Sequence, residues 1–198
     1  MPSDVLKNAL LTEVMRKSYT VDTEDSGDFG MPGGLDISYY GTWVSGDRAC
    51  KPLFEPHPVD PSAFAFVGMH NTSVEFAEAT ESYATVADAK RVMAQNFAQA
   101  KGCHTFRMKD AAHGEVVRYT HSVTATRHGT IDLFLHHFNG STAEWIYDFH
   151  MFEGRVDGEM VHIIWGSSGG KTDPSVPAFR QFQKVVGAYR AGHPRSTA

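Results

Sequence analysis

Histidine and acidic residues are interspersed among aromatic residues throughout the segment 115–168. Three pairs typical of tight turns divide this segment: His128-Gly129, Asn139-Gly140 and Asp157-Gly158. Asn-Gly and Asp-Gly favour two-residue type I′ hairpins, because both central positions require a positive φ. The segment is therefore predicted to form four antiparallel strands whose register these turns set. One face of this sheet, named here the aromatic face, then carries Tyr119, His121, Val123, Asp132, Phe134, His136, Phe138, Trp145, Tyr147, Phe149, Met151, Glu153, Met160, His162 and Ile164.

The predicted register places His121 directly opposite His136. Neighbouring imidazoles titrate near neutral pH, and their mutual repulsion lowers the pKa of at least one of them. Such a pair is either a base available near pH 7, two of the three protein ligands of a metal, or a stacked structural pair. No carboxylate is adjacent in this register to act as a third ligand, so no metal site is predicted.

The same register places Asp132 opposite Tyr147 and Glu153 opposite His162. A carboxylate beside a phenol among aromatic rings is suited to general acid or base chemistry. The alternative is a structural hydrogen bond between Asp132 and Tyr147. Glu153 and His162 adjoin the third turn and are interpreted as a solvent-facing pair.

The aromatic face is predicted to stay open as a pocket, because it holds more ionisable groups than a helix-packed face tolerates. Its opposite face is strongly apolar and carries Asp148 and His150 as neighbours on one strand. The segments 23–34 and 167–172 contain glycine and lack an apolar stripe, so they are predicted to act as lids. The predicted ligand-binding residues are Tyr119, Phe134, Trp145, Phe149 and Met151.

Hydrophobic periodicity, capping residues and breaker residues predict the remaining elements. Helices are predicted at 4–17, from Thr85 to Gly102, and at 173–191. The further strands are predicted at 35–44, 63–70, 73–82 and 104–109, while the prolines of 51–61 argue against regular structure there. Neither an internal repeat nor a long linker divides the chain, so we predict a single α+β domain over residues 1–198. Its expected architecture is a curved antiparallel meander sheet packed with helices.

Composition excludes several classes of protein. The chain has 198 residues and a formal net charge of −5, without a cluster of Lys or Arg, which argues against nucleic-acid or anionic-membrane partners. No apolar run approaches the ~20 residues that span a bilayer. The first 17 residues lack the pattern of a signal peptide, so the expected states are a cytoplasmic protein or a mature segment with an added initiator Met. No dinucleotide, phosphate-loop or zinc-protease motif occurs, and no cofactor is predicted.

The two cysteines, Cys50 and Cys103, are compatible with two free thiols or with one disulfide, and composition does not distinguish these states. Their surroundings carry a resemblance, however. Asp47-Arg-Ala-Cys50 precedes a proline-rich stretch and a strand pair, and a helix that begins at Thr85-Val-Ala-Asp88 ends in Lys101-Gly-Cys103.

This order of elements resembles the extracytoplasmic sensor domain of PknH-type bacterial serine/threonine kinases and related lipoproteins. The resemblance implies a disulfide between Cys50 and Cys103, an extracytoplasmic location and a ligand-binding cleft over the sheet. The second cysteine pair usual in that family, within the later strands, is absent here, and histidines and aromatic residues occupy the region.

Three classes of function follow from these observations. The first is an extracytoplasmic, sensor-like or lipoprotein-like domain that binds a hydrophobic small molecule. The second is a small pocket enzyme, a cyclase, isomerase or hydrolase, with Asp132, Tyr147, His121 and His136 as its catalytic residues. The third is an interaction protein whose aromatic face is buried in a homodimer.

Overall fold

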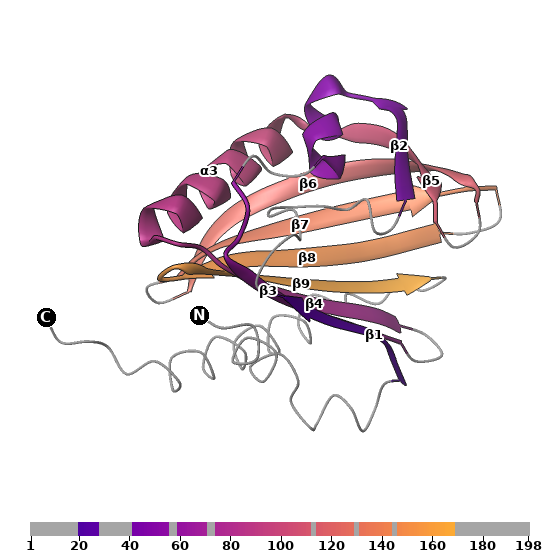
Figure 1. The fold of residues 1–198 in the computed structure, drawn as a ribbon. Coiled ribbons are helices and arrows are strands. Elements are labelled where there is room, and N and C mark those ends of the chain that lie inside the picture. Colours follow the sequence, from indigo (N-terminus) through magenta and orange to yellow (C-terminus); the bar gives the residue numbers. More distant parts are fainter. Residues whose placement is uncertain are drawn as a thin grey trace, which may run out of the picture.

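The structure is a computed structural model that describes residues 20–27, 41–55, 59–70, 74–111, 114–128, 131–143 and 146–168. Over these residues it confirms the predicted α+β class, with one antiparallel sheet of nine strands in the order β1-β3-β4-β9-β8-β7-β6-β5-β2 (Figure 1). The strands are β1 (Thr20–Gly27), β2 (Gly41–Gly46), β3 (Ala63–His70), β4 (Val74–Ser82), β5 (Thr105–Asp110), β6 (Val116–His128), β7 (Ile131–Ser141), β8 (Ile146–Val156) and β9 (Glu159–Ser168). The described helical elements are the 3₁₀-helix η2 (Arg48–Phe54) and the α-helix α3 (Val86–Gly102).

Helix α3 begins where the sequence predicts, at the N-cap residue Thr85. The Thr85 hydroxyl oxygen accepts a hydrogen bond from the backbone N–H of Asp88 at 3.1 Å, which satisfies one of the unpaired donors of the first turn. One stripe of the helix is buried against the sheet and consists of Ala89, Val92, Met93, Asn96 and Ala100. The apolar spacing along α3 therefore sets which of its sides faces the strands.

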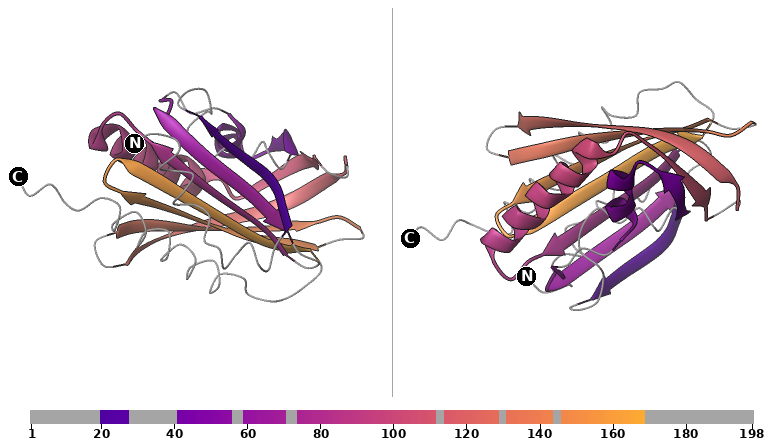
Figure 2. Two further views of the ribbon diagram at one scale, coloured as in Figure 1. Left: turned by 60° about the horizontal axis from the view of Figure 1, so that its bottom comes forward. Right: turned by 90° about the horizontal axis from the view of Figure 1, so that it is seen from above.

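Both α3 and η2 lie on the same side of the curved sheet (Figures 1 and 2). The side they cover is the aromatic face, where buried residues of the two helices form core clusters with Phe106, Tyr119, Phe138, Met151 and Met160. The expectation that this face stays open is therefore wrong beneath α3 and η2. Its ionisable side chains are tolerated because they bind one another and Asn96 of the helix.

The registers of the three hairpins differ in how well the turn residues predict them. Glu153 pairs with His162 across β8 and β9 as predicted, and Asp157 in the turn has a φ of 54°. His121 pairs with Phe138 rather than His136, which is a shift of two residues. Because the shift is even, every side chain of β6 keeps its predicted face.

The predicted turn at Asn139-Gly140 is wrong, because β7 continues through both residues to Ser141. Tyr147 pairs with Gly140, and Asp132 lies far along β7 from it, so the predicted pair of Asp132 and Tyr147 does not form. A Cβ atom on Gly140 would collide with the ring of Tyr119 on β6. This glycine serves the close approach of an aromatic ring within a strand and not a turn.

Other expectations are confirmed or corrected near the edges of the sheet. The strand predicted at 63–70 is present, and the strand predicted at 35–44 is described as β2 from Gly41. Residues 23–27 of the segment predicted to act as a lid, 23–34, belong instead to strand β1, and Pro52 lies inside η2, where no regular structure was expected. The predicted helices at 4–17 and 173–191 lie outside the described residues. Within the described part of the chain, no helix has the length and apolar character needed to cross a membrane.

Candidate functional site

A chain of buried polar side chains crosses the aromatic face beneath α3. It begins at the carbonyl oxygen of Cys103, which lies 2.9 Å from His121 Nδ1. His121 Nε2 lies 3.2 Å from His136 Nδ1, and His136 Nε2 lies 3.3 Å from Glu153 Oε2. Asn96 of α3 completes the chain by donating from Nδ2 to Glu153 Oε1 at 2.8 Å. The two histidines are thus in contact as predicted, although they are not directly opposed in the ladder.

The donors and acceptors along this chain restrict its protonation. The Cys103 carbonyl only accepts, so His121 carries hydrogen on Nδ1 and presents the lone pair of Nε2 to the Nδ1–H of His136. One proton then lies between His136 Nε2 and Glu153 Oε2. Either a protonated Glu153 donates to a neutral His136, or an imidazolium donates to a carboxylate. Both arrangements give His136 and Glu153 a combined charge of zero, which suits their complete burial.

Burial lowers the pKa of His121 to about 4, and the hydrogen bond to the Cys103 carbonyl only partly offsets this effect. The proximity of the His136 ring lowers the pKa of His121 further. His121 is therefore neutral at pH 7. A proton added to His121 Nε2 would place two N–H groups against each other at the contact with His136.

A second buried cluster lies beside the first, at the edge of α3. Tyr83 donates from its hydroxyl to Glu81 Oε2 at 2.7 Å, and His162 Nε2 lies 3.4 Å from the same oxygen. Burial opposes the charged form of His162, but the nearby carboxylate of Glu81 outweighs this effect, so the pKa of His162 is raised. Burial and then the charge of Glu81 raise the pKa of Tyr83. The predicted solvent-facing pair of Glu153 and His162 is instead buried, because α3 covers both side chains.

The four predicted catalytic residues do not converge on one site. Asp132 is exposed near the start of β7, whereas Tyr147 packs beside the aromatic core, its ring centroid 6.4 Å from that of Tyr119. His121 is 5% exposed and His136 is fully buried. The described arrangement therefore offers no point where Asp132, Tyr147 and the histidine pair could act on one substrate.

The predicted ligand-binding residues form the core rather than the surface of a cleft. Tyr119 and Met151 are each 2% exposed, and Phe134 and Phe149 are partly buried against the two core clusters. Phe134 stacks on Phe97 of α3 with ring centroids 4.2 Å apart. Trp145 lies outside the described residues.

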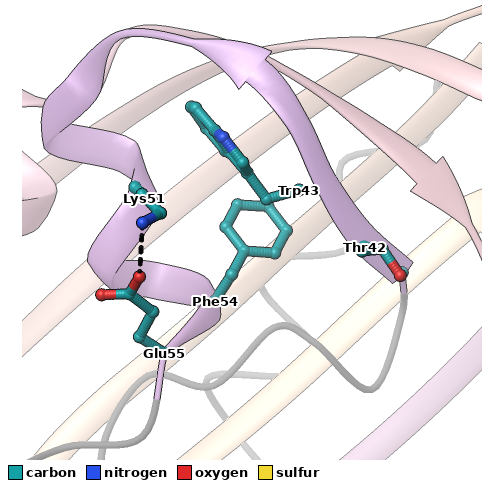
Figure 3. Close-up of a pocket in the computed structure, with 6 residues that line it drawn as sticks. Thr42, Trp43, Lys51, Phe54 and Glu55 are labelled. Atoms are coloured by element: carbon teal, nitrogen blue, oxygen red, sulfur yellow. Dashed lines mark ion pairs between the residues drawn. The ribbon is translucent and has the colours of Figure 1, made fainter.

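A pocket opens at the margin of this aromatic core, between β2 and η2 (Figure 3). Its volume is about 190 Å³, and its lining residues are Gly41, Thr42, Trp43, Lys51, Phe54 and Glu55. The rings of Trp43 and Phe54 meet edge to face at 5.6 Å, and both pack against the buried ring of Phe106. The pocket thus joins an aromatic wall that continues through Phe106 into the core.

The polar side of the pocket is an ion pair on η2. Lys51 Nζ lies 3.0 Å from Glu55 Oε1, and both side chains are half exposed. Exposed pairs at this spacing contribute little to stability, so Lys51 can exchange Glu55 for another anion at small cost. Sequence reasoning missed this pocket because the prolines of 51–61 argue against regular structure there. The spacing of Lys51 and Glu55, four residues apart beside Phe54, was the available signal.

A disulfide between Cys50 and Cys103 fastens the pocket to the end of α3, as the family resemblance implied. Asp47, at the start of η2, accepts hydrogen bonds from the backbone N–H groups of Thr105 at 2.8 Å and His104 at 3.0 Å. These bonds, Thr105 foremost, lower the pKa of the Asp47 carboxyl. The covalent and hydrogen-bonded links together hold η2 and β2 at the end of the sheet.

Comparison with solved structures identifies the same architecture elsewhere. The extracellular domain of PknH from Mycobacterium tuberculosis superimposes with a TM-score of 0.64 at 12% identity, over 96% of this chain and 97% of that one. A Mycobacterium smegmatis protein, the Rv0999 ortholog, matches with a TM-score of 0.52 at 11% identity, over 95% of this chain and 97% of its own. No protein-family model matches the chain, and no curated protein is similar to it in sequence. The predicted resemblance to the PknH-type sensor domain is therefore confirmed at the level of the fold.

Proposed function

We propose that this chain is an extracytoplasmic, sensor-like domain that binds a hydrophobic small molecule at the margin of its aromatic core. The observation that carries this proposal is the fold, which the chain shares over 96% of its length with the extracellular domain of a kinase. The disulfide supports the same location, because such bridges persist in oxidising compartments and are rare in the cytosol.

The pocket between β2 and η2 is the binding site that we propose. Trp43 and Phe54 offer an aromatic wall, and Lys51 offers a cation beside it. This combination suits a planar apolar molecule with an anionic group, which would stack on the rings and displace Glu55 from Lys51. The predicted ligand residues Tyr119, Phe149 and Met151 then support the wall from behind, within the same core cluster.

The test uses the anionic fluorophore 1-anilinonaphthalene-8-sulfonate, which has both an aromatic body and a sulfonate. Titration of the folded protein should show a saturable site, and Trp43→Ala should weaken the affinity about tenfold or more, equivalent to ~1.4 kcal/mol. Val44→Ala is the matched control, because Val44 is the next residue of β2 and is 45% exposed. Circular dichroism must show that both variants remain folded. Equal affinities of the Trp43→Ala and Val44→Ala variants would exclude this pocket.

The structure does not provide the arrangements on which the other two classes, the small pocket enzyme and the homodimeric interaction protein, were based. The enzyme class proposed that Asp132, Tyr147 and the histidine pair supply acid–base groups to one pocket, and the register places Asp132 and Tyr147 far apart. The homodimer required a second copy to bury the aromatic face, which α3 and η2 already cover. Neither class gains a specific observation in its favour.

A further inference from the structure

A separate group of metal-ligand side chains lies on the opposite face of the sheet from α3. His137 of β7 pairs directly with His150 of β8, and Asp148 lies two residues before His150 on the same strand. Side chains alternate along a strand, so these three residues share the face that His136 and Met151 do not occupy. The group is thus independent of the buried histidine chain and of the pocket at β2.

The three side chains are close enough to hold one ion. One ligand atom from each of them lies within 4.8 Å of the other two. His137 Nε2 is 2.6 Å from Asp148 Oδ1, and the His137 and His150 rings stack with centroids 4.3 Å apart. Ligands bound at ~2.1 Å to one ion lie about 3.0–3.4 Å apart. Small side-chain rotations that tilt the two rings toward each other would bring the three ligand atoms to this spacing.

We propose that His137, Asp148 and His150 form a binding site for a divalent transition-metal ion such as Zn²⁺. Two imidazoles and one carboxylate are a donor set that suits zinc and its neighbours in the transition series. Two hydrogen-bonded central strands carry all three ligands, so the protein supplies a rigid frame for them.

Three protein ligands leave at least one coordination position for water or for an external ligand. The side chains of His137 and Asp148 are 42% and 19% exposed, so an ion can reach them from solvent. This site is distinct from the histidine pair on the aromatic face, where a third ligand was lacking in the predicted register.

The experiment is a calorimetric titration of the chelator-dialysed protein with ZnCl₂. We expect one site per chain, with affinity lowered about tenfold or more by His137→Ala and by Asp148→Asn. Asp148→Asn keeps the size of the side chain and removes only its charge. It therefore tests the site even if the His137→Ala variant does not fold. His104→Ala is the matched control, because it removes an exposed imidazole from the residue that precedes β5.

The expected results are wild-type affinity in His104→Ala and reduced affinity in the two site variants. A second readout is Co²⁺, which should give visible ligand-field bands in the wild-type protein and weaker ones in Asp148→Asn. Absence of Zn²⁺ binding to the wild type, or equal loss of affinity in the His104→Ala control, would overturn the proposal. A site variant that retains wild-type affinity while folded would overturn it equally.

Discussion

At the scale of single residues, the histidines beneath α3 are held by hydrogen bonds that run from a backbone carbonyl to a helix side chain. His121 and His136 link the Cys103 carbonyl to Glu153, and Asn96 of α3 donates the last hydrogen bond of this series to Glu153. A buried polar group without a partner costs about 1–3 kcal/mol, so the complete chain explains how this face tolerates ionisable groups. The same series of hydrogen bonds makes the stability of the folded state sensitive to acid.

Acid sensitivity gives a prediction for His121. Its folded-state pKa is about 4 against an ordinary value of 6.5, so between these values the unfolded chain binds a proton that the folded chain does not. The free energy of unfolding should therefore fall as pH drops from 6.5 to 4, by about 3 kcal/mol at 1.36 kcal/mol per pH unit. His121→Gln, which does not titrate, should be less stable at pH 7 yet lose much less stability across this window. Urea denaturation at several pH values measures both slopes.

His162 changes the free energy of unfolding with pH in the opposite direction, so its contribution has to be separated from that of His121. Its folded-state pKa is raised, so its contribution is present below its unfolded value and is lost as pH rises through the folded value. Wild type and His121→Gln share this contribution, and the difference between their slopes therefore isolates His121. Parallel slopes would show that His121 is not held neutral by its surroundings.

At the scale of elements, the disulfide connects two short parts that build the pocket. Cys50 lies in η2 and Cys103 caps α3, and both sulfur-bearing side chains are buried in the same core cluster. Without the bridge, η2 would depend on the packing of Leu53 and Phe54 and on the hydrogen bonds of Asp47. The pocket should therefore loosen before the central strands do.

Replacement of both cysteines by Ala should lower stability by about 4 kcal/mol, the chain-entropy value for a loop of this length. The loop spans 53 residues. The variant should also bind 1-anilinonaphthalene-8-sulfonate more weakly at the β2–η2 pocket. Thermal melting and the fluorescence titration provide the two readouts. Thiol titration of unreduced wild-type protein should find no reactive thiol, and two reactive thiols would contradict both the bridge and the proposed location.

At the scale of the whole molecule, one continuous sheet connects the described segments from β1 to β2. The order of the strands places β1 and β2 at opposite edges, with the last four strands of the described chain in the middle. Unfolding of the four central strands would remove one ladder partner from β4 and one from β5, and so weaken the support of both edge strands. We propose, as the sequence predicts, that the chain is a single domain.

A single domain should unfold in one cooperative transition. Far-ultraviolet circular dichroism reports the strands and α3, whereas tryptophan fluorescence reports the surroundings of Trp43 and the other two tryptophans. In urea, the two probes should give the same midpoint for the oxidised protein. Two separated midpoints would show that part of the chain folds as an independent unit.

The residues within hairpins show why some registers were predictable. Asp157-Gly158 forms the turn that its local signal predicts, with Asp157 at a φ of 54°, and the pairing of Glu153 with His162 is confirmed. Asn139-Gly140 has the same local signal, yet it lies within a strand because Tyr119 packs over the glycine. Tyr119 is about 20 residues away along the chain, so a local pattern cannot reveal this contact.

Side-chain alternation, the start of α3 and the α+β class could be read from the sequence, because each depends on local periodicity or on a capping residue next to the element. The common face of His121, His136 and Glu153 survived the register shifts because those shifts were even. Only the tertiary structure decided that α3 and η2 cover this face, that Asp132 and Tyr147 stay apart, and that the pocket lies at Trp43 and Phe54. These outcomes depend on which distant surfaces meet and exclude water, and a face with charged groups becomes buried when Asn96 and a backbone carbonyl complete its hydrogen bonds.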